Sequence, residues 1–121
     1  ICSQCKVEDN TVHIFVDCIK VKLFWERFKD YISKSQGKPC QLSTSEIIFG
    51  KFGISNLSVN YCILYAKWYI HLNKSQDLIS FDAFKDYMKS VFIIEKQIYV
   101  NKGREASFCK QYGSFTKLLC N

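Results

Sequence analysis

Proline and glycine are scarce in this chain, and their scarcity favours helices. The 121 residues include one proline and five glycines, the two residues that most often break a chain into turns. Hydrophobic residues make up 48% of the sequence, which excludes an intrinsically disordered protein. No uninterrupted apolar run approaches the roughly 20 residues of a membrane-spanning helix, so we expect no membrane partner. The length suits one domain with a real core.

Features of a secreted, disulfide-bonded domain are also lacking. The chain has seven cysteines, an odd number, and no signal peptide, so we expect an intracellular protein of the nucleus and cytoplasm. It begins with Ile1, and its only methionine is Met88, so we expect a fragment of a longer protein. Four thiols show no second metal-ligand spacing and are expected to pack or to have no role: Cys40, Cys62, Cys109 and Cys120.

Four potential metal ligands lie near the start of the sequence. Cys2, Cys5, His13 and Cys18 are separated by two, seven and four residues. Thiolate and imidazole suit tetrahedral Zn²⁺, and four protein ligands leave no position for water, so such a site is structural rather than catalytic. The alternative is a set of unrelated core residues, since free cysteine often packs as a small hydrophobe. The spacing favours a zinc knuckle over residues 1–18, with folding coupled to metal binding.

The segment after the knuckle has the spacing of an amphipathic helix. Apolar residues recur at three- and four-residue steps over 19–34, and Asp17 is a suitable N-cap. Phe24 and Trp25 are adjacent, and both are expected to pack in the core rather than to stack on bases. A short apolar element is expected over 45–52.

The second half of the chain predicts three further helices. Residues 57–72 are apolar nearly all round, as in a central buried helix. Ser80 is a suitable N-cap for a helix that stops at 101–103, and 104–119 predicts a weaker final helix interrupted by Gly113. The predicted fold class is mainly α. A small N-terminal zinc knuckle is followed by a bundle of about four helices over 19–121, packed with the knuckle as one unit.

Basic and aromatic residues near the ligands suggest a surface for nucleic acid. The net charge of +6 fits a polyanionic partner without proving one. Lys6 adjoins a metal ligand, and Lys20 and Lys22 follow the last one, so they can neutralise phosphates or simply form a solvated face. Phe15 lies between the last two ligands, where it can stack on a base or pack beneath the metal.

The ligand row and an aromatic pair behind it form one extended pattern. It reads Cys2-x-x-Cys5, then Thr11-Val12-His13-Ile14-Phe15-Val16-Asp17-Cys18, then Phe24-Trp25. This pattern resembles the zinc-binding segment at the C-terminal end of LINE-type (non-LTR) retrotransposon reverse transcriptases. Later segments are similar to that family's tail: Ile48-Phe49-Gly50, Ala66-Lys67-Trp68-Tyr69-Ile70 and Ser80-Phe81-x-x-Phe84.

The resemblance implies a function as well as a fold. The parent chain would be an RNA-directed DNA polymerase whose catalytic carboxylates lie upstream, so this segment would not itself be an enzyme. With Zn²⁺ as cofactor, the segment would bind RNA or DNA and help to hold template RNA or target DNA during target-primed reverse transcription. Its other partner would be the upstream polymerase domain of the same chain. The alternative is a zinc-stabilised helical scaffold that docks to the polymerase body without touching nucleic acid.

Overall fold

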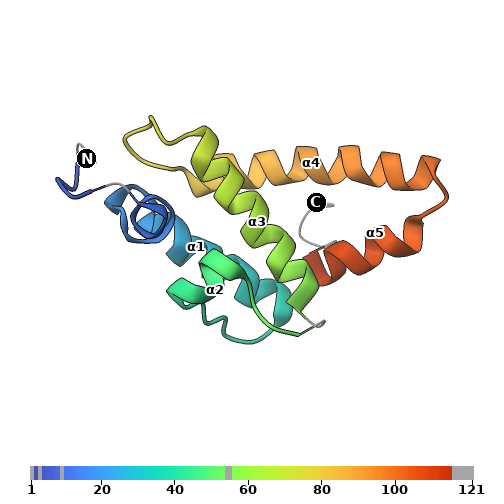
Figure 1. Ribbon diagram of the computed structural model, residues 1–121. Helices are drawn as coiled ribbons and strands as arrows, with labels where there is room; N and C mark the ends of the chain where they lie inside the picture. The colour runs from blue at the N-terminus through green and yellow to red at the C-terminus, as the bar shows by residue number, and fades with distance from the viewer. Residues whose placement is uncertain (1, 3, 9, 54–55, 116–121) are drawn as a thin grey trace.

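The computed structural model describes residues 2, 4–8, 10–53 and 56–115, and the regular structure of those residues is entirely helical (Figure 1). The mainly α fold predicted from the sequence is confirmed. No helix in these ranges is long and apolar enough to cross a membrane. The elements in chain order are η1 (His13–Asp17), α1 (Ile19–Gln36), α2 (Thr44–Phe49), α3 (Leu57–Leu72), α4 (Phe81–Asn101), α5 (Glu105–Tyr112) and η3 (Gly113–Phe115).

The last predicted helix is shorter than its apolar pattern suggested. α5 ends at Tyr112, and Gly113 has a positive φ of 53° and opens the 3-10 turn η3. Gly113 therefore interrupts the helix as predicted, because a left-handed backbone is easiest for glycine. Residues 116–119 of the predicted helix, and Cys120, lie outside the described residues.

Helix α1 begins at residue 19 as predicted, but its cap is not the predicted one. Cys18 has an extended backbone, with φ −63° and ψ 138°, and occupies the N-cap position without a side-chain cap. Asp17 is not the cap, because it is the last residue of the π-helical turn η1 and its backbone is still helical. The helix ends where Gly37 takes a left-handed φ of 69° and its amide donates to the Ser33 carbonyl.

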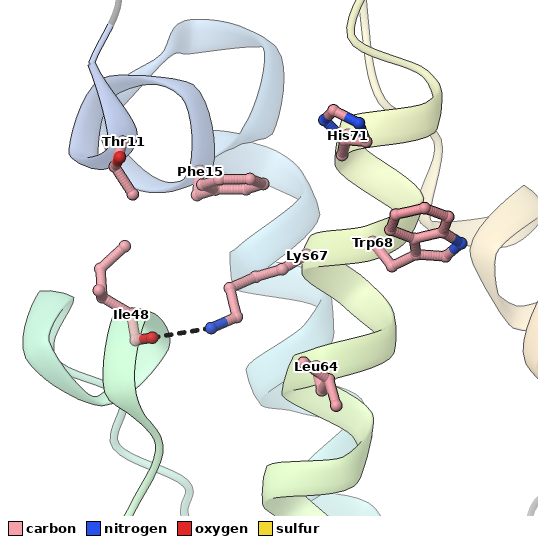
Figure 2. A pocket seen from close by; sticks show the side chains of 7 residues that line it. All are labelled: Thr11, Phe15, Ile48, Leu64, Lys67, Trp68 and His71. Carbon is pink, nitrogen blue, oxygen red and sulfur yellow. Dashed lines mark hydrogen bonds between the residues drawn. The ribbon is translucent and has the colours of Figure 1, made fainter.

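The starts of α2 and α4 are fixed by serine caps. Ser43 and Glu46 form a reciprocal capping box at α2, which the sequence analysis did not identify. Ser80 Oγ accepts from the Ala83 amide at 3.2 Å, so the predicted cap of α4 is confirmed. Helix α2 is held against α3 by Lys67, whose Nζ donates to the Ile48 carbonyl at 2.8 Å (Figure 2).

A cluster of aromatic rings joins α1 to α4. The Phe24 ring lies 5.3 Å from that of Phe84 and 5.2 Å from that of Trp25, both edge-on. Phe24, Trp25 and the neighbouring Phe28 are all buried, so the prediction that the adjacent pair packs in the core is confirmed. Burying a side chain of this size contributes about 1.5–3 kcal/mol.

Helix α3 contacts α4, α5, η1 and η3, so it lies at the centre of the fold. Beside the middle of α3 a carboxylate joins three helices. Glu95 of α4 accepts a hydrogen bond from the Tyr65 hydroxyl of α3. It also accepts from Gln111 Nε2 and from the Tyr112 hydroxyl of α5, and both of these bonds are 2.7 Å long. These charge-assisted bonds fix the angle at which α5 folds back along α4.

Candidate metal centre

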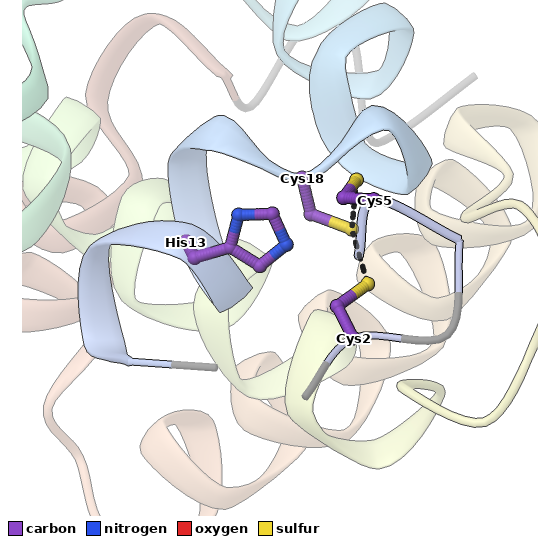
Figure 3. A group of neighbouring side chains, drawn as sticks. All are labelled: Cys2, Cys5, His13 and Cys18. Atoms are coloured by element: carbon purple, nitrogen blue, oxygen red, sulfur yellow. Dashed lines mark hydrogen bonds between the residues drawn. The ribbon is translucent and has the colours of Figure 1, made fainter. Parts of the chain in front are cut away.

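The N-terminal segment brings the four predicted metal ligands to one point (Figure 3). One ligand atom from each of Cys2, Cys5, His13 and Cys18 lies within 4.8 Å of the other three. The Cys18 sulfur is 3.8 Å from that of Cys2 and 3.9 Å from that of Cys5. Sequence reasoning therefore identified a real cluster, and a single ion can contact all four side chains.

The imidazole of His13 gives an independent sign that the cluster suits a metal. His13 is buried, and among the buried side-chain nitrogen and oxygen atoms described, its Nε2 has no hydrogen-bond partner. Leaving a buried polar atom unpaired costs about 1–3 kcal/mol. A metal bound at Nε2 would remove that cost. The His13 amide is held by Asn10, whose Oδ1 accepts from it at 2.8 Å.

The two buried thiols have opposite surroundings. The Cys5 amide, hydrogen-bonded to Cys2, and the adjacent His13 side chain lower the pKa of that thiol to about 6. Burial raises the pKa of Cys18 to about 11. The cluster can therefore form one thiolate readily, whereas a thiolate at Cys18 needs a cation beside it to offset desolvation.

A tight turn carries the first two cysteines. Lys6 has a left-handed φ of 59°, and its amide donates to the Cys2 carbonyl at 2.9 Å. The Cys2 amide in turn donates to the Val7 carbonyl at 2.8 Å. The Ile19 amide donates to the Cys5 sulfur at 3.5 Å and joins this turn to the start of α1.

The other two ligands flank η1, a single turn of π-helix that begins at His13 and is followed by Cys18. Its defining bond runs from the Cys18 amide to the His13 carbonyl at 2.8 Å. Trp25, in the second turn of α1, donates from Nε1 to the Phe15 carbonyl at 2.5 Å and ties η1 to the helix. The position of Trp25 in the core was predicted from the sequence, but this bond was not, because a polar contact across ten residues has no local signal.

The predicted nucleic-acid residues occupy different surroundings. Lys6 and Lys22 are exposed, whereas Lys20 is half-buried and its Nζ donates to the Lys74 carbonyl at 3.0 Å. Within the described ranges, none of the three predicted lysines forms an ion pair with an acidic side chain. Phe15 is half-buried, packs against the core and also borders a pocket.

Comparison of the chain with protein-family models, curated proteins and solved structures finds no match. The side chains themselves therefore carry the functional inference. They define a closed site of three thiols and one imidazole, anchored by hydrogen bonds to the first helix. The three lysines near it form no ion pair with any described acidic side chain.

Proposed function

We propose that this chain is a zinc-stabilised, non-catalytic nucleic-acid-binding module. Following the resemblance in its sequence, we assign it to the C-terminal end of a LINE-type retrotransposon reverse transcriptase, where it helps to hold template RNA or target DNA during target-primed reverse transcription. The observation that carries the proposal is the closed Cys₃His cluster, in which a buried imidazole nitrogen has no hydrogen-bond partner among the described residues.

Zinc is the metal that the cluster supports best. Zn–S bonds of about 2.3 Å in a tetrahedron place two sulfurs about 3.8 Å apart. The separations of the Cys18 sulfur from the other two, 3.8 and 3.9 Å, agree with that edge. Soft thiolates disfavour Mg²⁺ and Ca²⁺, which prefer oxygen ligands. Four protein ligands also leave no position for an activated water, which argues against a zinc hydrolase.

Charge around the cluster supports a polyanionic partner. Three thiolates, a neutral imidazole and Zn²⁺ sum to one negative charge, which nearby lysines more than offset. Lys6, Lys20 and Lys22 form what we call the basic set, and Lys20 contacts the backbone of Lys74. Each lysine that meets a phosphate releases a counterion, so three contacts to a single strand give a slope of about −2 in log affinity against log salt.

A salt titration with charge-matched variants tests this function. Lys6→Glu with Lys22→Glu reverses two exposed charges of the basic set, whereas Lys96→Glu with Lys102→Glu makes the same change in net charge at the C-terminal end of α4. That end lies across the molecule from the N-terminal segment (Figure 1). Binding of short single-stranded RNA and DNA should weaken strongly, with a shallower salt slope, in the first variant. The second variant should remain close to the parent.

A different result would change the assignment. Equal losses in both variants would mean that net charge, and not the basic set, attracts the strand. No binding to either strand at low salt would refute the function.

The second candidate is a docking scaffold for the polymerase body. It is favoured by two aromatic side chains at and just beyond the end of α2, Phe49 and Phe52, which are 85% and 99% exposed. Large exposed rings are a common feature of protein interfaces. If strands do not bind but the upstream polymerase domain captures this chain, and Phe49→Ser with Phe52→Ser abolishes that capture, the scaffold is the correct function.

A further inference from the structure

A pocket of about 380 Å³ lies where the N-terminal segment, α2 and α3 meet (Figure 2). Thr11 and Phe15 border it from the N-terminal segment, Ile48 from α2, and Leu64, Lys67 and Trp68 from α3. His71, one turn beyond Lys67, completes the wall. We call this cavity the side pocket. The same stretch of chain that brings His13 to the metal cluster thus brings Phe15 to the side pocket.

The walls of the side pocket are aromatic and partly exposed. Trp68 is 51% exposed, and its ring lies 5.6 Å from that of His71 at an interplanar angle of 32°. Phe15 faces the pocket from η1, on the side opposite α3 (Figure 2). Three rings therefore border the side pocket, Phe15 from η1 and Trp68 and His71 from α3, and an aromatic ring that is partly exposed can stack on a planar guest.

The polar groups of the pocket are suited to an acceptor-rich guest. Lys67 Nζ uses one of its three donors on the Ile48 carbonyl, which leaves two for a ligand. Burial lowers the pKa of Lys67, so this ammonium group is poorly solvated and gains from an acceptor. The residues lining the pocket include no carboxylate, and His71 adds a further polar group. A positive donor without a neighbouring carboxylate suits a ligand that carries negative charge. It also suits one whose rings have carbonyl and ring-nitrogen acceptors.

The volume of the side pocket limits which ligands can bind in it. Two turns of helix, at a diameter of about 10 Å and a length of about 11 Å, take up roughly twice the volume of the side pocket. A single planar ring system fits within about 380 Å³. An apolar protein side chain would also fit, but it would leave the free donors of Lys67 unpaired.

We propose that the side pocket holds one unpaired base of a single-stranded nucleic acid, stacked beside Trp68, with Lys67 donating to an acceptor on the base. The inference rests on the proposed function, because the same strand would meet the basic set with its phosphates. It deepens that function by separating two contributions. The lysines attract the backbone, and the pocket distinguishes a strand that has bases from one that has none.

The test compares two probes of equal charge on the zinc-loaded chain. One is an oligothymidylate of about 12 nucleotides, within the range of known single-strand sites, and the other is an abasic strand of the same length. We expect the strand with bases to bind about 5- to 150-fold more tightly, the factor that one stacked base supplies. Trp68→Ala should remove most of this preference. The matched control Phe52→Ala removes an exposed ring that does not line the pocket and should keep the preference.

The possible results distinguish failure of the pocket hypothesis from failure of the proposed nucleic-acid function. Equal binding of both probes with a steep salt slope overturns the pocket and leaves the proposed function intact. A preference for bases that survives Trp68→Ala places the stacking elsewhere and leaves the pocket to an apolar protein side chain. Absence of binding to both probes at low salt refutes the function and the inference together. Circular dichroism of Trp68→Ala must match the parent, as expected for a half-exposed side chain.

Discussion

The hydrogen bond from Trp25 to the metal turn gives the sharpest test of how the N-terminal segment is built. Trp25→Phe keeps a ring in the core but removes the only N–H that reaches the Phe15 carbonyl in the described structure. Losing one partner of a part-buried hydrogen bond costs about 1–2 kcal/mol. The smaller ring loses further contacts, because the parent indole is only 4% exposed and a small cavity costs roughly 1 kcal/mol more. The metal-loaded variant should therefore lose about 2–3 kcal/mol of unfolding free energy.

Metal affinity should fall together with stability. The Phe15 carbonyl belongs to the π-helical turn that carries His13 at its start and precedes Cys18 at its end. A looser turn holds these two ligands less well, so metal affinity should fall by about 10-fold, the lower end of the range for groups bonded to the ligands themselves. Competition with a chromogenic zinc chelator measures the affinity, and urea denaturation of the zinc-saturated protein measures the stability.

Trp68→Phe is the matched control. The substitution is chemically identical, but Trp68 is half-exposed, and its indole N–H has no partner among the described residues. The control should lose less than about 0.5 kcal/mol and keep its metal affinity. If Trp25→Phe loses stability while its zinc affinity stays equal to that of the control, Trp25 is only a core residue, and the positioning role is refuted.

Three further substitutions test how much individual interactions contribute to the stability of the helical body. Glu95→Ala should lower the free energy of unfolding, measured by urea denaturation, by about 2–3 kcal/mol, because it leaves three donors from α3 and α5 without their carboxylate. A loss below about 0.5 kcal/mol would show that water satisfies these donors in place of the carboxylate. Phe28→Ala should cost about 3–5 kcal/mol, since its ring is 0% exposed, and a smaller loss would mean that the core collapses into the cavity. Arg27→Met removes an exposed pair with Asp82, so its melting temperature should match that of the parent at high salt; a clear drop there would contradict a screened surface pair.

The helical body was largely predictable because its apolar pattern and its caps agree. The predicted range 57–72 coincides with α3, whose apolar residues continue to both ends. Ser80 and the stop at 101–103 bound α4, where a good cap and a loop residue flank a clear three- and four-residue repeat. Such signals are local, so the sequence can show them without knowledge of the packing.

The environment of the candidate site was less predictable, because distant contacts define it. The ligand spacing identified the four side chains, but the π-helical turn that holds two of them did not follow from the sequence. The run from Val12 to Val16 is apolar and β-branched enough to suit a strand, and Trp25 fixes it as a turn from ten residues away. The side pocket was missed for a similar reason, since Lys67 and Ile48 meet only after α2 has packed on α3.

One turn of chain serves both the metal cluster and the side pocket, and this arrangement makes a last prediction. His13 and Phe15 lie two residues apart on η1, the first in the cluster and the second at the pocket wall. Ordering the turn for one ligand orders it for the other, so zinc and a stacked base should bind with positive coupling. Because coupling is reciprocal, an oligothymidylate should raise zinc affinity by the same factor by which zinc raises strand affinity.

Abasic strands supply the control for this coupling, because they meet the lysines without entering the side pocket. None of the three lysines of the basic set lies on η1, so contact with them orders that turn less than a base against Phe15 does. Chelator competition at saturating strand should therefore show a smaller rise in zinc affinity with the abasic probe. Equal rises with both probes would mean that backbone charge, and not the pocket wall, transmits the coupling, and the shared turn would then have no functional meaning.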